Sequence, residues 1–315
     1  MRVVASTGTD DIARVYIVDF GDGRLVECVE SVQPPLPRRE KWVLIISTLH
    51  GCPVGCLMCD AGHAYQGKLS KAELFAQIDF LVKKRFPDGI IAVDKFKIQF
   101  ARMGEPALNT EVLAVLAELP GRYRAPGLIA SLSTVAPAGT EPFFEKLLAI
   151  KNGAYPDGRF QFQFSIHTTD ETLRDKLVPV KKWSFAEMAS YGERFYRGGD
   201  RKITLNFALA AGMPVAPDTL VRHFDPDHFL IKITPLNPTH RAGENGLTSY
   251  LDPYLPEDED ALIGSLRGAG YDVLVSIGEV EENRIGSNCG QYVLAHMSSQ
   301  RPIHGGYSYG IDRHA

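Results

Sequence analysis

Three cysteines within eight residues, Cys52, Cys56 and Cys59, constrain this chain more than any other feature. The gaps of three and two residues let one short loop direct three thiolates at a single inorganic centre. Thiolates in such an arrangement hold iron–sulfur clusters or zinc. Three ligands are one short for a cubane with four irons, so one iron would remain open to a substrate.

The composition fits a large α/β enzyme. The chain has 315 residues, of which 44% are hydrophobic, enough for one α/β barrel with short additions or for two modest domains. The net charge of −4 and the pI of about 6.2 give no strong field for nucleic acid, so any RNA binding would depend on local patches such as residues 83–85 or 181–182.

The cysteine count and the hydropathy predict a cytoplasmic protein. Five cysteines, three of them clustered, do not form a disulfide framework, and a reducing compartment suits them. The first residues lack the apolar core of a signal peptide. No run of about 18 apolar residues occurs, so no membrane helix is expected.

The order of elements predicts a parallel sheet. Residues 13–20 and 24–29 flank the turn Gly21-Asp22-Gly23 as a small β unit, and residues 33–39 form a linker. Strands are expected at 42–48, 95–102, 127–134, 160–167, 202–209, 228–235 and 271–277. Helices are expected at 70–86, with a Ser70/Glu73 capping box, and at 110–119 (ended by Pro120-Gly121), 141–151, 170–177, 184–196 and 257–268. Repeated β-α units of this length favour a parallel sheet, closed as a barrel or open.

Several of these strands alternate between apolar and polar residues. In the strand at 160–167 one face carries Phe160, Phe162, Phe164 and Ile166, and the other carries Gln161, Gln163, Ser165 and His167. If helices cover the outside, the polar faces line an interior, which indicates a wide, partly open barrel that holds a polar ligand. An antiparallel sheet with one wet face is the alternative, and the intervening helices argue against it.

The cysteine loop resembles that of radical S-adenosylmethionine (SAM) enzymes, and four further segments resemble the RlmN and Cfr methylases. These segments are 103–109 (MGEPALN), 165–179 (SIH followed by TLRDKLVP), 235–238 (PLNP) and 287–291 (SNCGQ). They occur in the family's order, and the resemblance spans roughly residues 13–293. It implies a partial (β/α)6 TIM-like barrel at 41–280, a short N-terminal β extension at 1–40 and a C-terminal segment at 281–315.

The resemblance also implies cofactors and site residues. Cys52, Cys56 and Cys59 would hold a 4Fe-4S cluster whose open iron chelates SAM, and a reductant of flavodoxin or ferredoxin type would supply the electron. The residues that correspond to SAM or substrate contacts are Gly104, Glu105, Ser133, Ser165, Ile166, His167 and Asn237. Glu105 would meet the SAM amino group, and Asn237 would contact adenine or ribose. Arg174 and Asp175 are expected to form an internal ion pair.

Cys289 corresponds to the family's methyl carrier. In that chemistry one SAM methylates the thiol by displacement, and a radical from a second SAM takes hydrogen from the S-methyl group, so that the carbon adds to an electron-poor ring carbon. Glu27 corresponds to the proposed base that removes the ring proton. Ile45 stands where the family has its resolving cysteine, and Cys28 would substitute for it only if its strand lies against the site. About 40 residues precede the barrel, where the family has an RNA-binding domain.

The sequence therefore predicts SAM-dependent methylation of an unactivated sp2 carbon, with RNA adenine as the first candidate and a nucleobase or natural product as the others. Two alternatives stay open. A radical SAM enzyme could abstract hydrogen directly from a small molecule, with Cys289 as a bystander. A zinc-binding protein without catalysis would combine the three cysteines with His50, His63 or Cys289.

Overall fold

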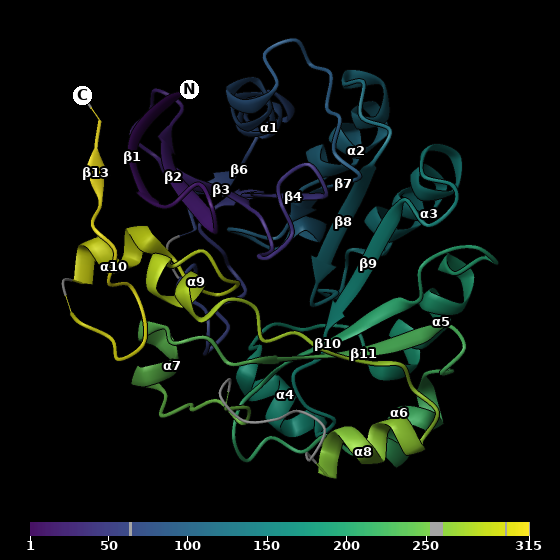
Figure 1. The fold of residues 1–315 in the computed structure, drawn as a ribbon. Helices are drawn as coiled ribbons and strands as arrows, with labels where there is room; N and C mark the ends of the chain where they lie inside the picture. Colours follow the sequence, from purple (N-terminus) through teal and green to yellow (C-terminus); the bar gives the residue numbers. More distant parts are fainter. Residues whose placement is uncertain (63–64, 253–260, 300, 315) are drawn as a thin grey trace.

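The computed structural model describes residues 1–62, 65–252, 261–299 and 301–314. One sheet of eleven strands forms the body of the protein, in the order β12-β11-β10-β9-β8-β7-β4-β3-β2-β1-β13 (Figure 1). The strands of its parallel part are β4 (Lys41–Ile46), β7 (Lys95–Phe100), β8 (Leu128–Thr134), β9 (Phe160–Ser165), β10 (Ile203–Leu209), β11 (Phe229–Pro235) and β12 (Val273–Val275). Because β12 has no partner on its far side in this order, the barrel is open, and the predicted partial α/β barrel is confirmed.

The helices lie on both faces of the sheet: most of those that follow the parallel strands cover its outer face, and the last two pack on the opposite face of the N-terminal strands (Figure 1). They are α1 (Lys71–Arg85), α2 (Glu111–Arg122), α3 (Glu141–Ala154), α4 (Glu171–Leu177), α5 (Phe185–Phe195), α6 (Pro217–His223), α7 (His240–Glu244), α8 (Ala261–Gly268), α9 (Val280–Ile285) and α10 (Val293–Ser299). The capping box at Ser70 and Glu73 is present at the start of α1. The first part of the helix expected at 257–268 lies outside the described residues.

Helix α2 continues to Arg122, so the expected end at Pro120-Gly121 is wrong. A proline inside a helix removes the hydrogen bond to the carbonyl four residues earlier, here that of Leu116. The Tyr155 hydroxyl donates to this carbonyl at 2.6 Å and satisfies it from outside the helix. The tertiary contact thus replaces the bond that the proline lacks.

The N-terminal β extension is larger than the sequence pattern indicates. Strands β2 (Ala13–Asp19) and β3 (Leu25–Ser31) form the expected hairpin, and β3 pairs antiparallel with β4. Strand β1 (Arg2–Gly8) was not expected, and it pairs with both β2 and the two-residue strand β13 (Asp312–Arg313). The C-terminal segment therefore returns to the N-terminal strands (Figure 1). The sheet runs without a break across residue 40, and the three-part division of the chain stays a prediction.

The alternating pattern of β9 sorts its side chains as predicted. Phe160, Phe162 and Phe164 are buried on the outer face, where they pack against aromatic rings of α5, Tyr191 and Phe195. The polar residues point inward. The apolar faces of the strands thus form a core with the helices, and the barrel interior remains polar. Among the described residues, no helix is long and apolar enough to cross a membrane.

Candidate active site

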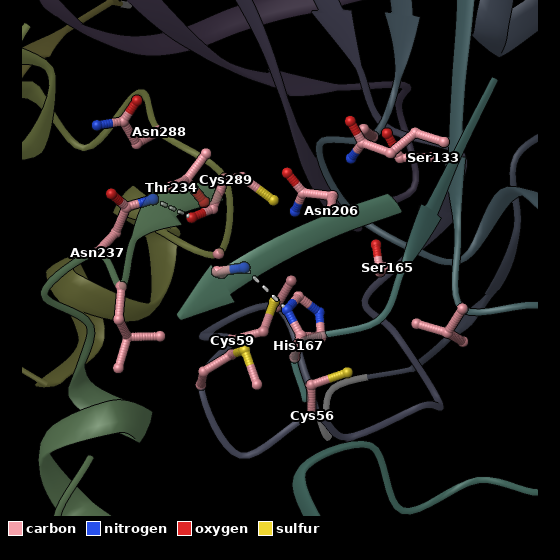
Figure 2. Close-up of a pocket in the computed structure, with 18 of the residues that line it drawn as sticks. Cys56, Cys59, Ser133, Ser165, His167, Asn206, Thr234, Asn237, Asn288 and Cys289 are labelled. Carbon is pink, nitrogen blue, oxygen red and sulfur yellow. Dashed lines mark hydrogen bonds between the residues drawn. The ribbon is translucent and has the colours of Figure 1, made fainter. Parts of the chain in front are cut away.

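A cavity of about 280 Å³ opens at the carboxyl ends of the parallel strands, beside the cysteine loop (Figure 2). The loop runs between two short strands that pair with each other, β5 (Leu49–His50) and β6 (Gly67–Lys68). Cys52, Cys56 and Cys59 all line the cavity, as the sequence predicts. Carboxyl ends of parallel strands are where sites collect in such folds.

The donor set suits an iron–sulfur cluster. Burial raises the pKa of the Cys52 thiol to about 11, and burial together with the neighbouring sulfurs raises the pKa values of Cys56 and Cys59. Backbone N–H groups of Val54, Gly55 and Glu105 oppose this shift at Cys52 by donating to its sulfur. Three thiolates packed in one loop repel one another, and a cationic iron cluster would offset that repulsion.

A single metal ion needs its protein ligands closer together than an iron–sulfur cluster does. Within the described residues, no three His, Cys, Asp or Glu side chains gather closely enough to hold one ion. A zinc ion needs its sulfur ligands about 2.3 Å away, whereas a cubane offers each thiolate a separate iron. The spacing of these side chains therefore argues against a single zinc ion, but it does not argue against a 4Fe-4S cluster. In the zinc alternative, His50 lies outside the cavity lining, and His63 lies outside the described residues.

Gly104 and Glu105 follow β7 at the rim of the cavity. Gly104 has φ of +96°, and a Cβ there would meet the Leu49 side chain at 2.5 Å, so this position needs glycine. Glu105 accepts hydrogen bonds from the Thr134 hydroxyl and from the N–H groups of Val135 and Ala107, at 2.5, 2.9 and 3.0 Å. Burial raises the pKa of its carboxyl to about 6, and these donors act in the opposite direction.

The next strands bring three of the expected contacts to the cavity: Ser133, Ser165 and His167 (Figure 2). The Ser133 hydroxyl is buried without a hydrogen-bond partner in the described structure, so a ligand would satisfy it. His167 accepts from the Ala208 N–H through Nδ1 at 3.1 Å, which leaves Nε2 for a ligand. Burial and the nearby Arg174 lower the pKa of His167 to about 4, so the ring is neutral at physiological pH.

Two other expectations for this region differ from the structure. The side chain of Ile166 lies in the hydrophobic core and does not reach the cavity. The expected Arg174–Asp175 ion pair is wrong. Arg174 donates to the backbone carbonyl of Trp183 at 3.0 Å, and Asp175 instead pairs with Lys182 at 2.5 Å. In α4 the two neighbours in sequence point in different directions, one into the core and one to solvent.

Cys289 lines the same cavity as the cysteine loop (Figure 2). Its segment bonds to that loop, because the Asp60 N–H donates to the Gly290 carbonyl at 2.9 Å. The Cys289 side chain is exposed to the cavity although protein surrounds it. Burial raises the pKa of this thiol, and the positive charges of Lys232 and Arg102 act to lower it. Asn237 lines the cavity, and one N–H of its Nδ2 donates to the Cys289 carbonyl at 2.7 Å, which leaves the second N–H and Oδ1 available to a ligand. Asn237 thus fixes the backbone of the candidate carrier.

Arg102 holds the same segment from the other side. Its guanidinium donates to the carbonyls of Gly286, Ser287 and Asn288 at 2.8, 3.2 and 3.1 Å. It also forms an ion pair with Glu27 at 2.5 Å. The sequence pattern gave no signal for this role, because the acceptors are backbone carbonyls more than 180 residues away.

Glu27 and Cys28 occupy opposite faces of β3. Glu27 is fully buried; one carboxylate oxygen accepts from Arg102 and the other from the Leu294 N–H at 2.7 Å. It does not line the cavity. Cys28 is also fully buried, but it lies in the core cluster on the helix side of the sheet. The structure therefore does not bring Cys28 to the site, and the condition for its role as a substitute resolver is not met.

Several cavity residues were not among the expected site residues: Gln99, Arg102, Gln163, Asn206, Lys232, Thr234, Glu282 and Asn288. The alternating strand pattern contained part of the signal, since Gln99, Gln163 and Asn206 fall on the polar faces. Asn206 is notable because its Oδ1 is buried without a partner in the described structure. The others depend on how distant segments meet.

Comparison with known proteins finds relatives that cover most of the chain. No protein-family model matches the chain. Proteins named as probable dual-specificity RNA methyltransferase RlmN are similar to it: one from Desulfitobacterium hafniense is 26% identical over 92% of this chain and 78% of its own length, and one from Streptomyces griseus is 28% identical over 91% and 75%. The dual-specificity RNA methyltransferase RlmN of Wolinella succinogenes is 25% identical over 92% and 83%.

A solved structure shares the fold. The crystal structure of a radical SAM methyltransferase from Sphaerobacter thermophilus matches with a TM-score of 0.72, covering 92% of this chain and 80% of that one at 22% identity. The chain therefore shares the fold of this radical SAM methyltransferase. The relatives named RlmN are similar to this chain over most of its length, and the resemblance drawn from its motifs is confirmed.

Proposed function

We propose that this enzyme methylates an unactivated sp2 carbon through a methyl group carried on Cys289. The observation that carries the proposal is the placement of Cys289. It faces the cavity that the three loop cysteines also line, and the Asp60 N–H donates to the carbonyl of the next residue, Gly290, at 2.9 Å. Asn237 and Arg102 hold the backbone of this segment. A carrier thiol must be accessible, fixed and close to the site of radical formation, and these contacts supply all three.

The loop cysteines Cys52, Cys56 and Cys59 would hold the 4Fe-4S cluster, which supplies the electron that splits SAM. Glu105 and the free hydroxyl of Ser133 would bind polar groups of SAM at the cavity rim. An external one-electron donor of flavodoxin or ferredoxin type would reduce the cluster.

The chain's own chemistry centres on one sulfur. In the first stage the Cys289 sulfur forms a bond to the SAM methyl carbon as the sulfonium C–S bond breaks, and the thiol proton passes to solvent. Lys232 and Arg102 favour the thiolate that this displacement needs. In the second stage one hydrogen atom of the S-methyl group would pass to the radical formed from a second SAM, and the S-methyl carbon would form the new bond to the ring carbon. Release of the product would then need loss of the ring proton and of one electron, followed by attack of an external thiol on the Cys289 sulfur. That attack would break the sulfur–carbon bond, leave a disulfide and let the carbon take up a proton.

The acceptor is the open part of the proposal. The relatives are named for RNA, and adenine in RNA is the first candidate from that side. A nucleobase or natural-product ring offers the same electron-poor carbon. The deprotonation step stays without an assigned base, because Glu27, which the resemblance suggests, is tied to Arg102 away from the cavity lining.

Mass spectrometry tests the carrier role directly. Protein produced with the loop cysteines intact should carry an S-methyl group on Cys289, and label from methyl-labelled SAM should appear there. Cys56→Ala is the matched control for cluster loss. Full product yield from Cys289→Ala would show that the carrier assignment is wrong and would favour direct hydrogen abstraction from the substrate. Anaerobically purified protein should be brown, with about four irons per chain.

A further inference from the structure

Lysine side chains enter the barrel interior beneath the cavity from three different strands. Lys41 lies on β4, Lys97 on β7 and Lys232 on β11. Lys97 is two residues before Gln99 on β7, so its side chain lies on the same inner face of the strand, and Gln99 lines the cavity. Lys232 on β11 pairs with Asn206 on β10. Lys232 itself lines the cavity.

Among the described residues these lysines form no ion pair, and Lys41 donates only to the side-chain oxygen of Gln33. In the described part of the chain, Lys232 has neither a hydrogen bond nor an ion pair. Lys97 has only a neutral partner, the Gln161 amide oxygen at 3.4 Å. Burial lowers the pKa of Lys97 to about 7, and the positive charges of Lys232 and Lys41 add to this effect. Lys97 and Lys232 are both partly exposed within the interior, so each ammonium can meet a ligand, and the closeness of like charges favours binding of an anion.

The nearest carboxyl does not balance the set. Glu282 lines the cavity, and its charge acts on both Lys41 and Lys232. Burial raises the pKa of Glu282 to about 7, so it is only partly ionised at neutral pH. Lys97, with a pKa of about 7, is also only partly charged at neutral pH, but three lysines still outnumber the one carboxyl group in the interior.

Neutral hydrogen-bond groups surround the lysines. Gln99, Gln163 and Asn206 line the same cavity and can donate through their side-chain amides. Lysine binds phosphate as a point charge, and amide donors complete the shell around the remaining oxygens. This combination is what an oxyanion needs when it is taken out of water.

We propose that Lys232 and Lys97 form an anion subsite that binds a phosphate or carboxylate group of the acceptor substrate, and that the acceptor is a small anionic molecule. The inference rests on the proposed function in taking the cavity as the place where the acceptor binds. The subsite lies inside the barrel, midway along the strands. A terminal group of a small molecule can reach that depth, whereas the phosphates of a folded RNA stay on its continuous backbone outside.

Anion binding can be measured without turnover. Line broadening of the ³¹P signal of inorganic phosphate and of the ¹⁹F signal of trifluoroacetate would be titrated against the full, cluster-loaded protein. The variants are Lys232→Met and Lys97→Met, and Lys146→Met, which removes an exposed lysine, is the matched control. We expect saturable broadening in the wild type and the control, and about tenfold weaker binding in each interior variant, the effect of losing one charge-assisted hydrogen bond.

The two probes distinguish the source of the anion. Broadening of phosphate alone would assign the subsite to phosphate esters, and broadening of trifluoroacetate alone would assign it to carboxylates. Thermal unfolding checks that the variants fold. Because methionine removes an unpaired charge from the interior, both interior variants should unfold at the same temperature as the wild type or at a higher one.

Three results would overturn the proposal: no saturable binding in the wild type, equal binding in the interior variants, or displacement of phosphate by a short adenine-containing RNA but not by adenosine monophosphate. Cys289 takes no part in these measurements. If phosphate binds as expected while label never reaches Cys289, the carrier proposal fails and the anion subsite stands.

Discussion

The contacts of Arg102 lead to a quantitative prediction about the segment that carries Cys289. We consider Arg102→Met, which keeps most of the side-chain volume and removes the guanidinium. The change leaves the Glu27 carboxylate, fully buried, without its counter-charge. It also leaves the carbonyls of residues 286–288 without their donor.

The magnitude follows from the burial of the pair. Removing one partner of a buried ion pair costs about 3–5 kcal/mol, because the remaining charge is left unpaired in a poorly solvated place. Replacing both partners, as in Arg102→Met/Glu27→Leu, removes that unpaired charge. We therefore expect the double variant to be more stable than Arg102→Met alone, although it still lacks the bonds to the carbonyls.

Two measurements separate stability from positioning. Urea unfolding gives the free energies, with Arg194→Met as the control, because the pair of Arg194 with Glu145 is about half exposed on both sides and should matter by less than about 1 kcal/mol. Alkylation of Cys289 by iodoacetamide, followed by peptide mass spectrometry, reports the freedom of its backbone. The rate should rise in both Arg102 variants and stay unchanged in the control.

Two results would contradict this prediction. If the double variant is less stable than Arg102→Met, the unpaired Glu27 carboxylate is not the cause of the loss. If the alkylation rate of Cys289 stays at the wild-type value in both Arg102 variants, the guanidinium does not hold this segment.

Three further predictions concern single residues. Cys56→Ala should yield colourless protein with a near-wild-type unfolding profile, and retention of about four irons per chain would contradict the cluster assignment. Cys28→Ala should leave turnover unchanged because this thiol lies on the helix side of the sheet, and accumulation of a covalent substrate adduct in this variant would contradict that placement. The depressed pKa of His167 should make stability fall as the pH drops from 6.5 to about 4, since the unfolded ring takes up its proton first; the loss attributable to this ring is about 3 kcal/mol. His167→Asn should flatten the unfolding free energy over that pH range, and an unchanged slope would exclude this ring as the source.

Much of the fold and part of the site follow from local sequence patterns. The cysteine spacing places three ligands in one loop, and the alternation at 160–167 predicts which side chains point inward. These features can be predicted because they depend only on the two-residue period of a strand and on residues close together in sequence. Strand β13 has only two residues, and its existence depends on pairing with β1.

The missed features depend on contacts between distant segments. The helix that passes through Pro120 requires the hydroxyl of Tyr155, and the role of Arg102 requires the loop at 286–288. The placement of Cys28 depends on which face of β3 packs against α1. Because Glu27 and Cys28 are adjacent in the strand, their side chains point to opposite faces. Sequence similarity transferred a role to Glu27 that its partners do not support, because likeness of a segment does not fix what the segment touches.

The return of the C-terminal strand to β1 limits how this enzyme can operate. The segment that carries Cys289 is anchored before the cysteine by Arg102 and beyond it by the pairing of β13 with β1. Such a doubly tethered stretch has little slack, so its sulfur cannot swing out to meet a partner on the surface. If Cys289 carries the methyl group as proposed, the acceptor has to enter the cavity to reach it.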